Sequence, residues 1–340
     1  MIRYVESLNQ SLDRLMSEDS RVFLVGEDLV DPYGGAFKVS RGLSTKYPSQ
    51  VISTPISEAG FTGLAIGMSL QGLRPIVEIM FGDFSTLICD QLVNHALKFS
   101  SMYDGKVKVP VVIRVPMGGR RGYGPTHSQT LETLFLNAPD LKVVAPSIYH
   151  DPGQMLFDVT TQSESPVLFV ENKISYAQKL KAPSRGSVDG FAFKHLIGFS
   201  KSLPTISLTT DPSQPPDITL ICYGGMAAIA AEAAMSFFKS DDVNTEVLIP
   251  SSVKPLPLID FAESIKLSGK VVIAEEAPRG WGWGAELSSL IVEEFFSFLE
   301  CAPVRVGSKE TSIPCSTKLE KLVLPQVDDV IGGMLELMES

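Results

Sequence analysis

The chain has 340 residues, which suggests about two domains, and 44% of them are hydrophobic, enough for large buried cores. Its net charge of −10 and the lack of any run of lysine and arginine argue against nucleic acid and membrane surfaces as partners. No apolar stretch is long enough to cross a bilayer and the first residues do not resemble a signal peptide, so we expect a soluble, cytoplasmic protein.

The first half of the chain alternates helices with strands. Apolar residues at helical spacing predict a helix over residues 5–17, and a continuous apolar run predicts a strand over 22–25 that ends in Gly26-Glu27-Asp28. Further strands are predicted at residues 51–52, 75–81, 109–115, 141–145 and 166–170. Further helices are predicted at residues 57–71, 84–102 and 152–162. Because the strands are continuous apolar runs separated by helices, they predict a parallel sheet buried on both faces.

A change in composition separates this half from the rest of the chain. Prolines punctuate the stretch before residue 217 and predict a linker over 181–216, which can include irregular strands. A second α/β unit follows, with strands predicted at 218–222, 243–249, 270–274 and 303–306. Its helices are predicted at 226–238, 259–267, 285–299 and 327–338. We therefore predict an α/β fold of two doubly wound domains, residues 1–180 and 217–340.

The four cysteines indicate neither a metal site nor a disulfide framework. They form no C-x-x-C pair and no cluster with histidine; they are Cys89, Cys222, Cys301 and Cys315. We interpret them as thiols in a reducing compartment and predict no metal ligands in this chain.

Chemistry is expected where strands end, because ligands of open parallel sheets bind at the carboxyl ends of the strands. Glu58 lies in the first turn of a predicted helix, where it serves either chemistry or the stabilisation of the helix start. Phe81 and Phe84 follow another strand and suit either stacking on a flat heterocycle or ordinary core packing.

A glycine-rich loop over residues 118–128 follows a third strand and carries Arg120, Arg121 and His127. Such loops often hold functional side chains. A histidine changes charge near neutral pH, so His127 suits proton transfer, although it could equally hydrogen-bond a carbonyl group of its own loop.

Together these stretches resemble the beta subunits of the thiamine-diphosphate-dependent 2-oxo acid dehydrogenases, the first components of the pyruvate, branched-chain and acetoin systems. The resemblance covers nearly the whole chain and is carried by residues 22–28, 34–43, 54–63, 72–75, 127–129 and 141–144. It implies a pyrimidine-binding domain of the transketolase type at residues 1–180 and a transketolase C-terminal-type domain at 217–340.

The resemblance also implies roles for individual residues. Glu58 falls on the glutamate that hydrogen-bonds the N1' nitrogen of the cofactor's aminopyrimidine. Ile56 and Phe84 fall on cofactor-binding positions, and Phe84 on the aromatic that lies against the pyrimidine ring. His127 falls on a histidine that contacts the 2-oxo acid adduct or the lipoyl group. Glu27 falls on an acidic position of a proton chain between two active sites.

A second chain is implied as well. The diphosphate of this cofactor needs Mg²⁺ held by oxygen ligands, which thiamine enzymes place on a Gly-Asp-Gly motif, and that string does not occur here. We therefore expect an alpha subunit to hold Mg²⁺ and the diphosphate in an α2β2 complex, with no activity from this chain alone. A lipoyl acyltransferase core is the expected acceptor.

Three departures from the family pattern bear on the site. Leu87 stands where several relatives have a polar residue, and Ser163 stands near the aspartate of a potassium site, which puts potassium binding in doubt. The pair Arg120-Arg121 is more basic than the matching loop of the pyruvate enzymes. We hypothesise that Arg121 meets a carboxylate or phosphate of the substrate.

Two other functions compete with the dehydrogenase. A non-oxidative two-subunit thiamine enzyme, such as a split transketolase or an acyloin-forming ligase, would share the fold and Glu58 but would not use the lipoyl carrier. A catalytically silent structural subunit is the other alternative, and the presence of Glu58 and His127 argues against it.

Overall fold

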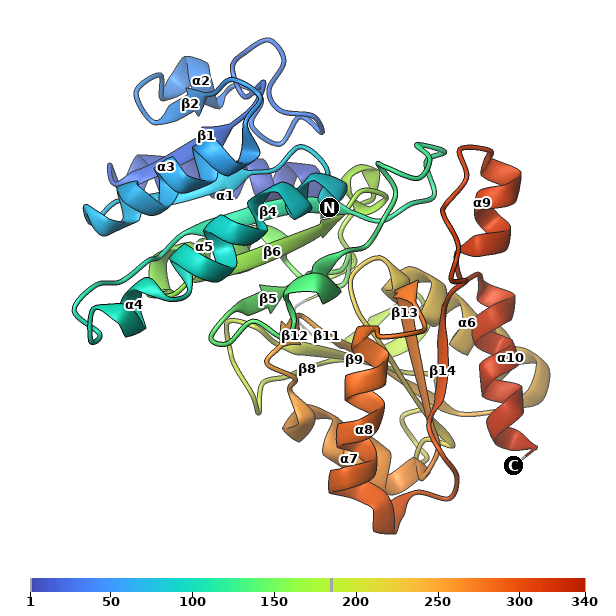
Figure 1. The fold of residues 1–340 in the computed structure, drawn as a ribbon. Coiled ribbons are helices and arrows are strands. Elements are labelled where there is room, and N and C mark those ends of the chain that lie inside the picture. Colours follow the sequence, from blue (N-terminus) through green and yellow to red (C-terminus); the bar gives the residue numbers. More distant parts are fainter. Residues whose placement is uncertain (1, 184–185, 340) are drawn as a thin grey trace. The chain divides into compact units, whose positions relative to one another are not determined.

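The computed structural model describes residues 2–183 and 186–339 and divides the chain into two compact α/β units. The first unit consists of Met1–Gly118, Gln129–Val144 and Asp151–Leu180. The second consists of Gly119–Ser128, Ala145–His150 and Lys181–Ser340. Each unit is built on a sheet with helices packed against it, which confirms the predicted fold class (Figure 1).

The strands of the first unit lie in the order β5-β6-β4-β3-β1-β2 and all run parallel. They are β1 (Val22–Gly26), β2 (Val51–Ser53), β3 (Arg74–Glu78), β4 (Val112–Met117), β5 (Lys142–Val144) and β6 (Val167–Asn172). Nearly all their side chains are buried, as expected for a parallel sheet covered on both faces. Within the register, Gly26 at the end of β1 is paired with Ser53 on one side and Glu78 on the other.

Three longer helices and several short ones complete this unit. Helix α1 (Tyr4–Glu18) packs along α5 (Pro152–Gln162), and α3 (Glu58–Leu70) packs on β1 and β3. Helix α5 begins where predicted because the Asp151 carboxylate accepts the N–H groups of Gly153 and Gln154, both at 3.1 Å. The short helices are α2 (Leu43–Lys46), η3 (Glu132–Phe135) and η4 (Ser175–Ala177).

The prediction of a single long helix over residues 84–102 is wrong. This segment is a 3₁₀ helix, η1 (Gly82–Ile88), then a π-helix, η2 (Gln91–Ala96), then a short α-helix, α4 (Phe99–Met102). Its buried positions Ile88, Leu92 and Ala96 recur every fourth residue, a longer repeat than the 3.6 residues of an α-helical turn. A wider π turn keeps such residues on one face.

The second sheet is mixed, with strands in the order β14-β13-β10-β11-β9-β8-β7. They are β7 (Gly186–Val188), β8 (Phe191–Leu196), β9 (Thr205–Thr209), β10 (Ile218–Cys222), β11 (Thr245–Pro250), β13 (Val271–Pro278) and β14 (Val304–Ser308). Strands β10, β11, β13 and β14 run parallel, whereas β7, β8 and β9 add antiparallel pairs. The antiparallel strands come from the stretch expected to be a linker, of which residues 184–185 lie outside the described residues.

Helices cover both faces of this second sheet. Helices α6 (Met226–Asp241) and α10 (Val327–Met338) pack together on one face, while α7 (Leu258–Ser268) and α8 (Trp283–Phe295) cover the other (Figure 1). The remaining elements are β12 (Ser252–Lys254), η5 (Phe296–Phe298) and α9 (Thr317–Val323). No helix in the described part of the chain is long and apolar enough to cross a membrane.

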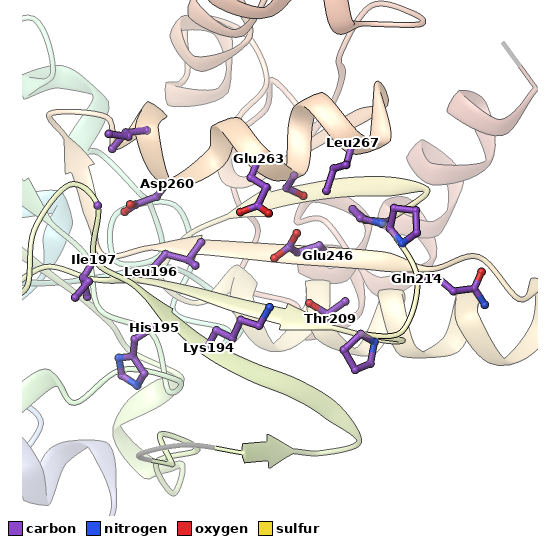
Figure 2. A pocket seen from close by; sticks show the side chains of 16 residues that line it. Lys194, His195, Leu196, Ile197, Thr209, Gln214, Glu246, Asp260, Glu263 and Leu267 are labelled. Carbon is purple, nitrogen blue, oxygen red and sulfur yellow. The ribbon is translucent and has the colours of Figure 1, made fainter.

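A cavity of about 540 Å³ lies in the second unit, beside α7. Figure 2 shows that Glu263 from α7 and Glu246 from β11 extend into it, together with Lys194 from β8. None of the residues singled out in the sequence lines it, so its size does not make it the candidate site.

Candidate functional site

Neighbouring strands of the first unit bring two buried acids to one edge of the sheet. Glu27 directly follows β1, and Glu58 opens α3 shortly after β2. The two strand ends are joined because the Thr54 N–H donates to the Gly26 carbonyl at 2.9 Å. The carboxyl ends of parallel strands are where such sheets bind ligands, so this edge is the expected position for a site.

Glu27 and Glu58 are both almost fully buried, with 7% and 6% of their surface exposed. Burial raises the pKa of Glu27 above its ordinary value, and the nearby charges of Glu58 and then Asp28 raise it further. Among the described residues, no lysine, arginine or histidine forms an ion pair with either acid. This is an acid pair without a compensating cation.

Unsatisfied polar atoms beside these acids favour a polar ligand. Glu27 Oε1 and Thr54 Oγ1 are buried and have no hydrogen-bond partner among the described residues. Ile56 lies between Thr54 and Glu58 in the sequence, and 83% of its surface is exposed. A ring that carries nitrogen atoms and an apolar edge, such as an aminopyrimidine, matches these groups in chemistry.

Two aromatic rings follow the next strand, β3. The Phe84 and Phe81 rings meet edge to face, with centroids 6.0 Å apart, and Phe81 meets Phe37 in the same way at 5.5 Å. Gly82 lies so close to Met117 at the end of β4 that an added Cβ would fall 2.5 Å from its Cγ. Only glycine fits there, which fixes this loop against the neighbouring strand. Phe84 is therefore held half-buried at the same sheet edge.

Sequence reasoning missed a polar contact beside Phe84. The Gln129 side-chain amide donates to Asp83 Oδ1 at 2.7 Å. Gln129 also closes the base of the glycine-rich loop, because its carbonyl accepts the Gly118 N–H at 3.2 Å. Both residues stand beside stretches that were singled out, but nothing in the sequence indicates that they pair.

The glycine-rich loop itself belongs to the second unit, as Gly119–Ser128. His127 is half-buried, and its Nδ1 lies 3.0 Å from Thr126 Oγ1. Arg121 is exposed, with its guanidinium carbon 5.4 Å from the centroid of the Tyr123 ring. Since Glu27, Ile56, Glu58 and Phe84 lie in the first unit, a shared site with His127 and Arg121 stays a prediction.

The Arg120 side chain contacts residues of its own unit. Its Nη2 donates to the Pro325 carbonyl at 2.6 Å, and its Nε lies 3.6 Å from Glu276 Oε2. Its backbone has a φ of 69°, in the left-handed region that a residue with a side chain rarely adopts. The Arg120 side chain therefore has a structural role within its own unit.

A second group of buried acids lies beneath the same sheet edge, and here a cation is present. Arg114 donates to Glu171 through Nε and Nη2, at 2.7 and 2.8 Å, and to Glu78 through Nη1 at 2.6 Å. Burial acts to lower the pKa of Arg114, but the two carboxylates outweigh it and raise that pKa. Tyr176 adds a hydrogen bond from its hydroxyl to Glu171 Oε2 at 2.6 Å.

Within residues 2–183 and 186–339, no three His, Cys, Asp or Glu side chains gather in a way that could hold a metal ion.

The family comparisons match both units of the chain. Residues 1–179 match the family "Transketolase, pyrimidine binding domain", and residues 211–330 match "Transketolase, C-terminal domain". Over its length the chain is also similar to a solved structure titled "Split gene transketolase, inactive beta4 tetramer". That likeness has a TM-score of 0.73 at 20% identity, covers 99% of this chain and 98% of the other, and shows the fold alone.

Several curated relatives span almost the whole chain. The mitochondrial pyruvate dehydrogenase E1 component subunit beta-2 of Oryza sativa is 36% identical over 96% of this chain and 83% of its own length. The pyruvate dehydrogenase E1 component subunit beta of Rickettsia bellii is 34% identical over 97% and 96%. The acetoin:2,6-dichlorophenolindophenol oxidoreductase subunit beta of Cupriavidus necator is 30% identical over 98% and 96%. The chain therefore belongs to the family of thiamine-dependent 2-oxo acid dehydrogenase beta subunits, built from transketolase-type pyrimidine-binding and C-terminal domains.

Proposed function

We propose that this chain is the beta subunit of a thiamine-diphosphate-dependent 2-oxo acid dehydrogenase, which decarboxylates a 2-oxo acid oxidatively and passes the acyl group to a lipoyl carrier. The relatives named pyruvate dehydrogenase support the reaction class. The observation that carries the proposal within the molecule is the buried, uncompensated acid pair Glu27 and Glu58 at the sheet edge.

When bound, thiamine diphosphate would supply the electron sink for loss of carbon dioxide from a 2-oxo acid. Glu58 would hold a hydrogen bond to the N1' nitrogen of the aminopyrimidine ring. Burial of Glu58 keeps water from competing for that bond and strengthens it. Phe84 would lie against the ring and Ile56 would cover its apolar part, so that the ring is oriented as well as hydrogen-bonded.

Glu27 would act as the proton reserve of Glu58. Burial and the nearby charge of Glu58 raise the pKa of Glu27, so it gives up a proton less readily than an ordinary glutamate and would exchange that proton with Glu58. This agrees with a place for Glu27 in a proton chain. His127, with Nδ1 beside Thr126, would present its other ring nitrogen to the 2-oxo acid adduct or the lipoyl group, and Arg121 would meet the substrate carboxylate.

An alpha subunit would supply the remainder of the site. The sequence lacks a Gly-Asp-Gly motif, so Mg²⁺ and the diphosphate would be held by that partner, in an α2β2 complex active only when both chains are present. The relatives named as beta subunits support an alpha partner. A lipoyl acyltransferase core would then receive the acyl group.

The decisive experiment is Glu58→Gln in the complex co-purified with its alpha partner. Glutamine keeps the shape but cannot hold the proton, so decarboxylation of 2-oxo acids should fall by roughly 10²–10⁴-fold. Glu286→Gln is the matched control, because Glu286 is also an acid in the first turn of a helix but is exposed. Full turnover by the Glu58→Gln complex would refute the proposal.

An acyloin substrate is the second candidate, favoured by the relative named for acetoin. The same wild-type complex distinguishes the two when it is assayed with 2-oxo acids and with acetoin, using dichlorophenolindophenol as electron acceptor. A higher kcat/KM for the 2-oxo acids supports the dehydrogenase, and a higher value for acetoin supports the second candidate.

A further inference from the structure

We propose that Glu320, assisted by Glu276, is a positioning residue that latches the loop 119–128 and thereby places His127 for the reaction. The inference rests on the proposed function for the role of His127. The latch itself follows from contacts within the second unit, to which both glutamates and the whole loop belong.

The Glu320 carboxylate accepts hydrogen bonds from the backbone of this loop. Glu320 lies on α9 with only 2% of its surface exposed. Its Oε1 accepts the Arg120 N–H at 2.7 Å, and its Oε2 accepts the Gly122 N–H at 3.0 Å. Hydrogen bonds from N–H groups to an ionised carboxylate are stronger than those between neutral groups. One buried side chain thus fixes two peptide groups of the loop.

Glu276 fixes the residue where the loop begins. It lies in β13, is 6% exposed, and its Oε1 accepts the Gly119 N–H at 2.6 Å. Arg120, whose own N–H is one of the three groups held by these glutamates, adopts a φ of 69°. Such a backbone is strained and persists only where the surroundings hold it. The two glutamates and the bond from Arg120 to the Pro325 carbonyl provide that hold.

A short series of contacts leads from the latch to His127. Gly124, at a φ of 80°, packs so closely on Cys315 that an added Cβ would lie 3.3 Å from the Cys315 Cβ. The Gly124 carbonyl accepts the His127 N–H at 3.3 Å. The position of the His127 backbone therefore depends on how the loop is seated against the segment around α9.

Glu320 is thus expected to act through His127 and not on the substrate. Each of its two oxygens accepts a backbone N–H group of the loop, so its assigned role is to position the loop. Its effect is preorganisation, because a side chain displaced by about 1 Å can lose about 10²-fold in rate. The same charge-assisted bonds also restrict local opening of the loop.

The test is Glu320→Gln in the co-purified complex. A glutamine side chain offers one acceptor oxygen and turns an N–H group toward the other donor, so the latch is half lost. We expect kcat/KM for the 2-oxo acid to fall by about 10- to 100-fold while the Kd for thiamine diphosphate stays unchanged. Lys318→Ala, an exposed change on the same helix, is the matched control and should leave both values unchanged.

A proteolysis readout makes the inference independent of turnover. Arg121 is an exposed trypsin site within the loop, and cleavage there requires local opening. Glu320→Gln should be cut after Arg121 faster than the wild type, and Lys318→Ala at the wild-type rate. Equal cleavage rates in all three would overturn the latch. This readout remains decisive even if Glu58→Gln shows that the proposed function is wrong.

A double-mutant cycle separates positioning from general destabilisation. If Glu320 acts through His127, Glu320→Gln should have no further effect on kcat/KM in a His127→Ala background. An equal loss in both backgrounds would overturn the positioning role. Should Glu320→Gln fail to fold, Gly124→Ala displaces the loop from Cys315 without changing the carboxylate, and it should reproduce both the activity loss and the faster cleavage.

Discussion

The first unit contains two groups of buried acids, and the two groups differ in whether a cation is paired with them. Glu78 and Glu171 share Arg114, which donates to both of them, and Tyr176 adds a further donor. The charge of Glu58 contributes to the raised pKa of Glu27, and no cation is paired with either acid in the described structure. Both groups are shielded from water, so burial alone does not distinguish them.

The difference separates a structural group from a functional one. A buried carboxylate that is paired and hydrogen-bonded holds its surroundings together, and removing its partner is costly. A buried carboxylate without such partners costs stability in the isolated chain, and such strained electrostatics are common at catalytic and binding sites. Three substitutions test this difference between the two groups of acids.

The largest effect is expected from Arg114→Met. It leaves Glu78 and Glu171 buried without their cation, and should lower the free energy of unfolding by about 3–5 kcal/mol at neutral pH. Burial already raises the pKa of Glu78 against the opposing effect of Arg114, so without Arg114 that carboxyl should take up a proton more readily. The deficit measured by denaturant unfolding should therefore shrink as the pH is lowered toward 5. A deficit that is the same at both pH values would contradict this account.

Tyr176→Phe tests the same group of acids by removing a single hydrogen bond and no charge. It removes the hydroxyl that donates to Glu171 Oε2 and leaves the ring stacked on Phe37. We expect a loss of about 1.5–3 kcal/mol, typical of a hydrogen bond to a charged acceptor, measured by denaturant unfolding of the purified chain. Tyr33→Phe, at an exposed tyrosine, should change nothing measurable. A neutral result for Tyr176→Phe would mean that Arg114 alone satisfies Glu171.

Glu27→Gln should have the smallest effect on the free energy of unfolding, and it should increase that free energy instead of lowering it. The pKa of Glu27 is raised above its ordinary value of 4.5, so between the two values the folded chain binds more protons than the unfolded one. Stability is therefore lost as the pH rises through that window, and the ionised carboxylate destabilises the fold at neutral pH. Glutamine should stabilise the chain by about 0.5–1 kcal/mol at pH 7 and by nothing at pH 4. Destabilisation at pH 7 would show that Glu27 is compensated after all.

The sequence predicted the elements best where local chemistry defines them. The last helix, α10, has the predicted bounds, and α5 begins where predicted because Asp151 caps it and Pro152 fits its first turn. In the stretch 84–102 the four-residue apolar repeat predicts an α-helix, but the segment forms a 3₁₀ helix, a π-helix and a short α-helix. The antiparallel strands β7 to β9 lie in a stretch whose prolines predict a linker, although that stretch also contains β-forming residues.

For the candidate site, the sequence could identify residues but not their pairings. The sequence indicates Glu58 from its place in the first turn of a predicted helix, and the family resemblance implies Glu27. Parallel pairing of β1 with β2 then brings the two together. The bond from Gln129 to Asp83 and the one from Arg120 to Glu320 join residues 46 and 200 positions apart. A single sequence has no local pattern that marks such contacts, and this is why the latch was missed.

The interleaving of the two units also sets an order for biosynthesis. The segments Gly119–Ser128 and Ala145–His150 belong to the second unit although they are translated long before most of it. Domains generally fold from the N-terminus as the chain leaves the ribosome. The loop that carries His127 must then wait, unsupported, until the ribosome has passed codon 320, so the nascent first unit can be well folded before that loop acquires its shape.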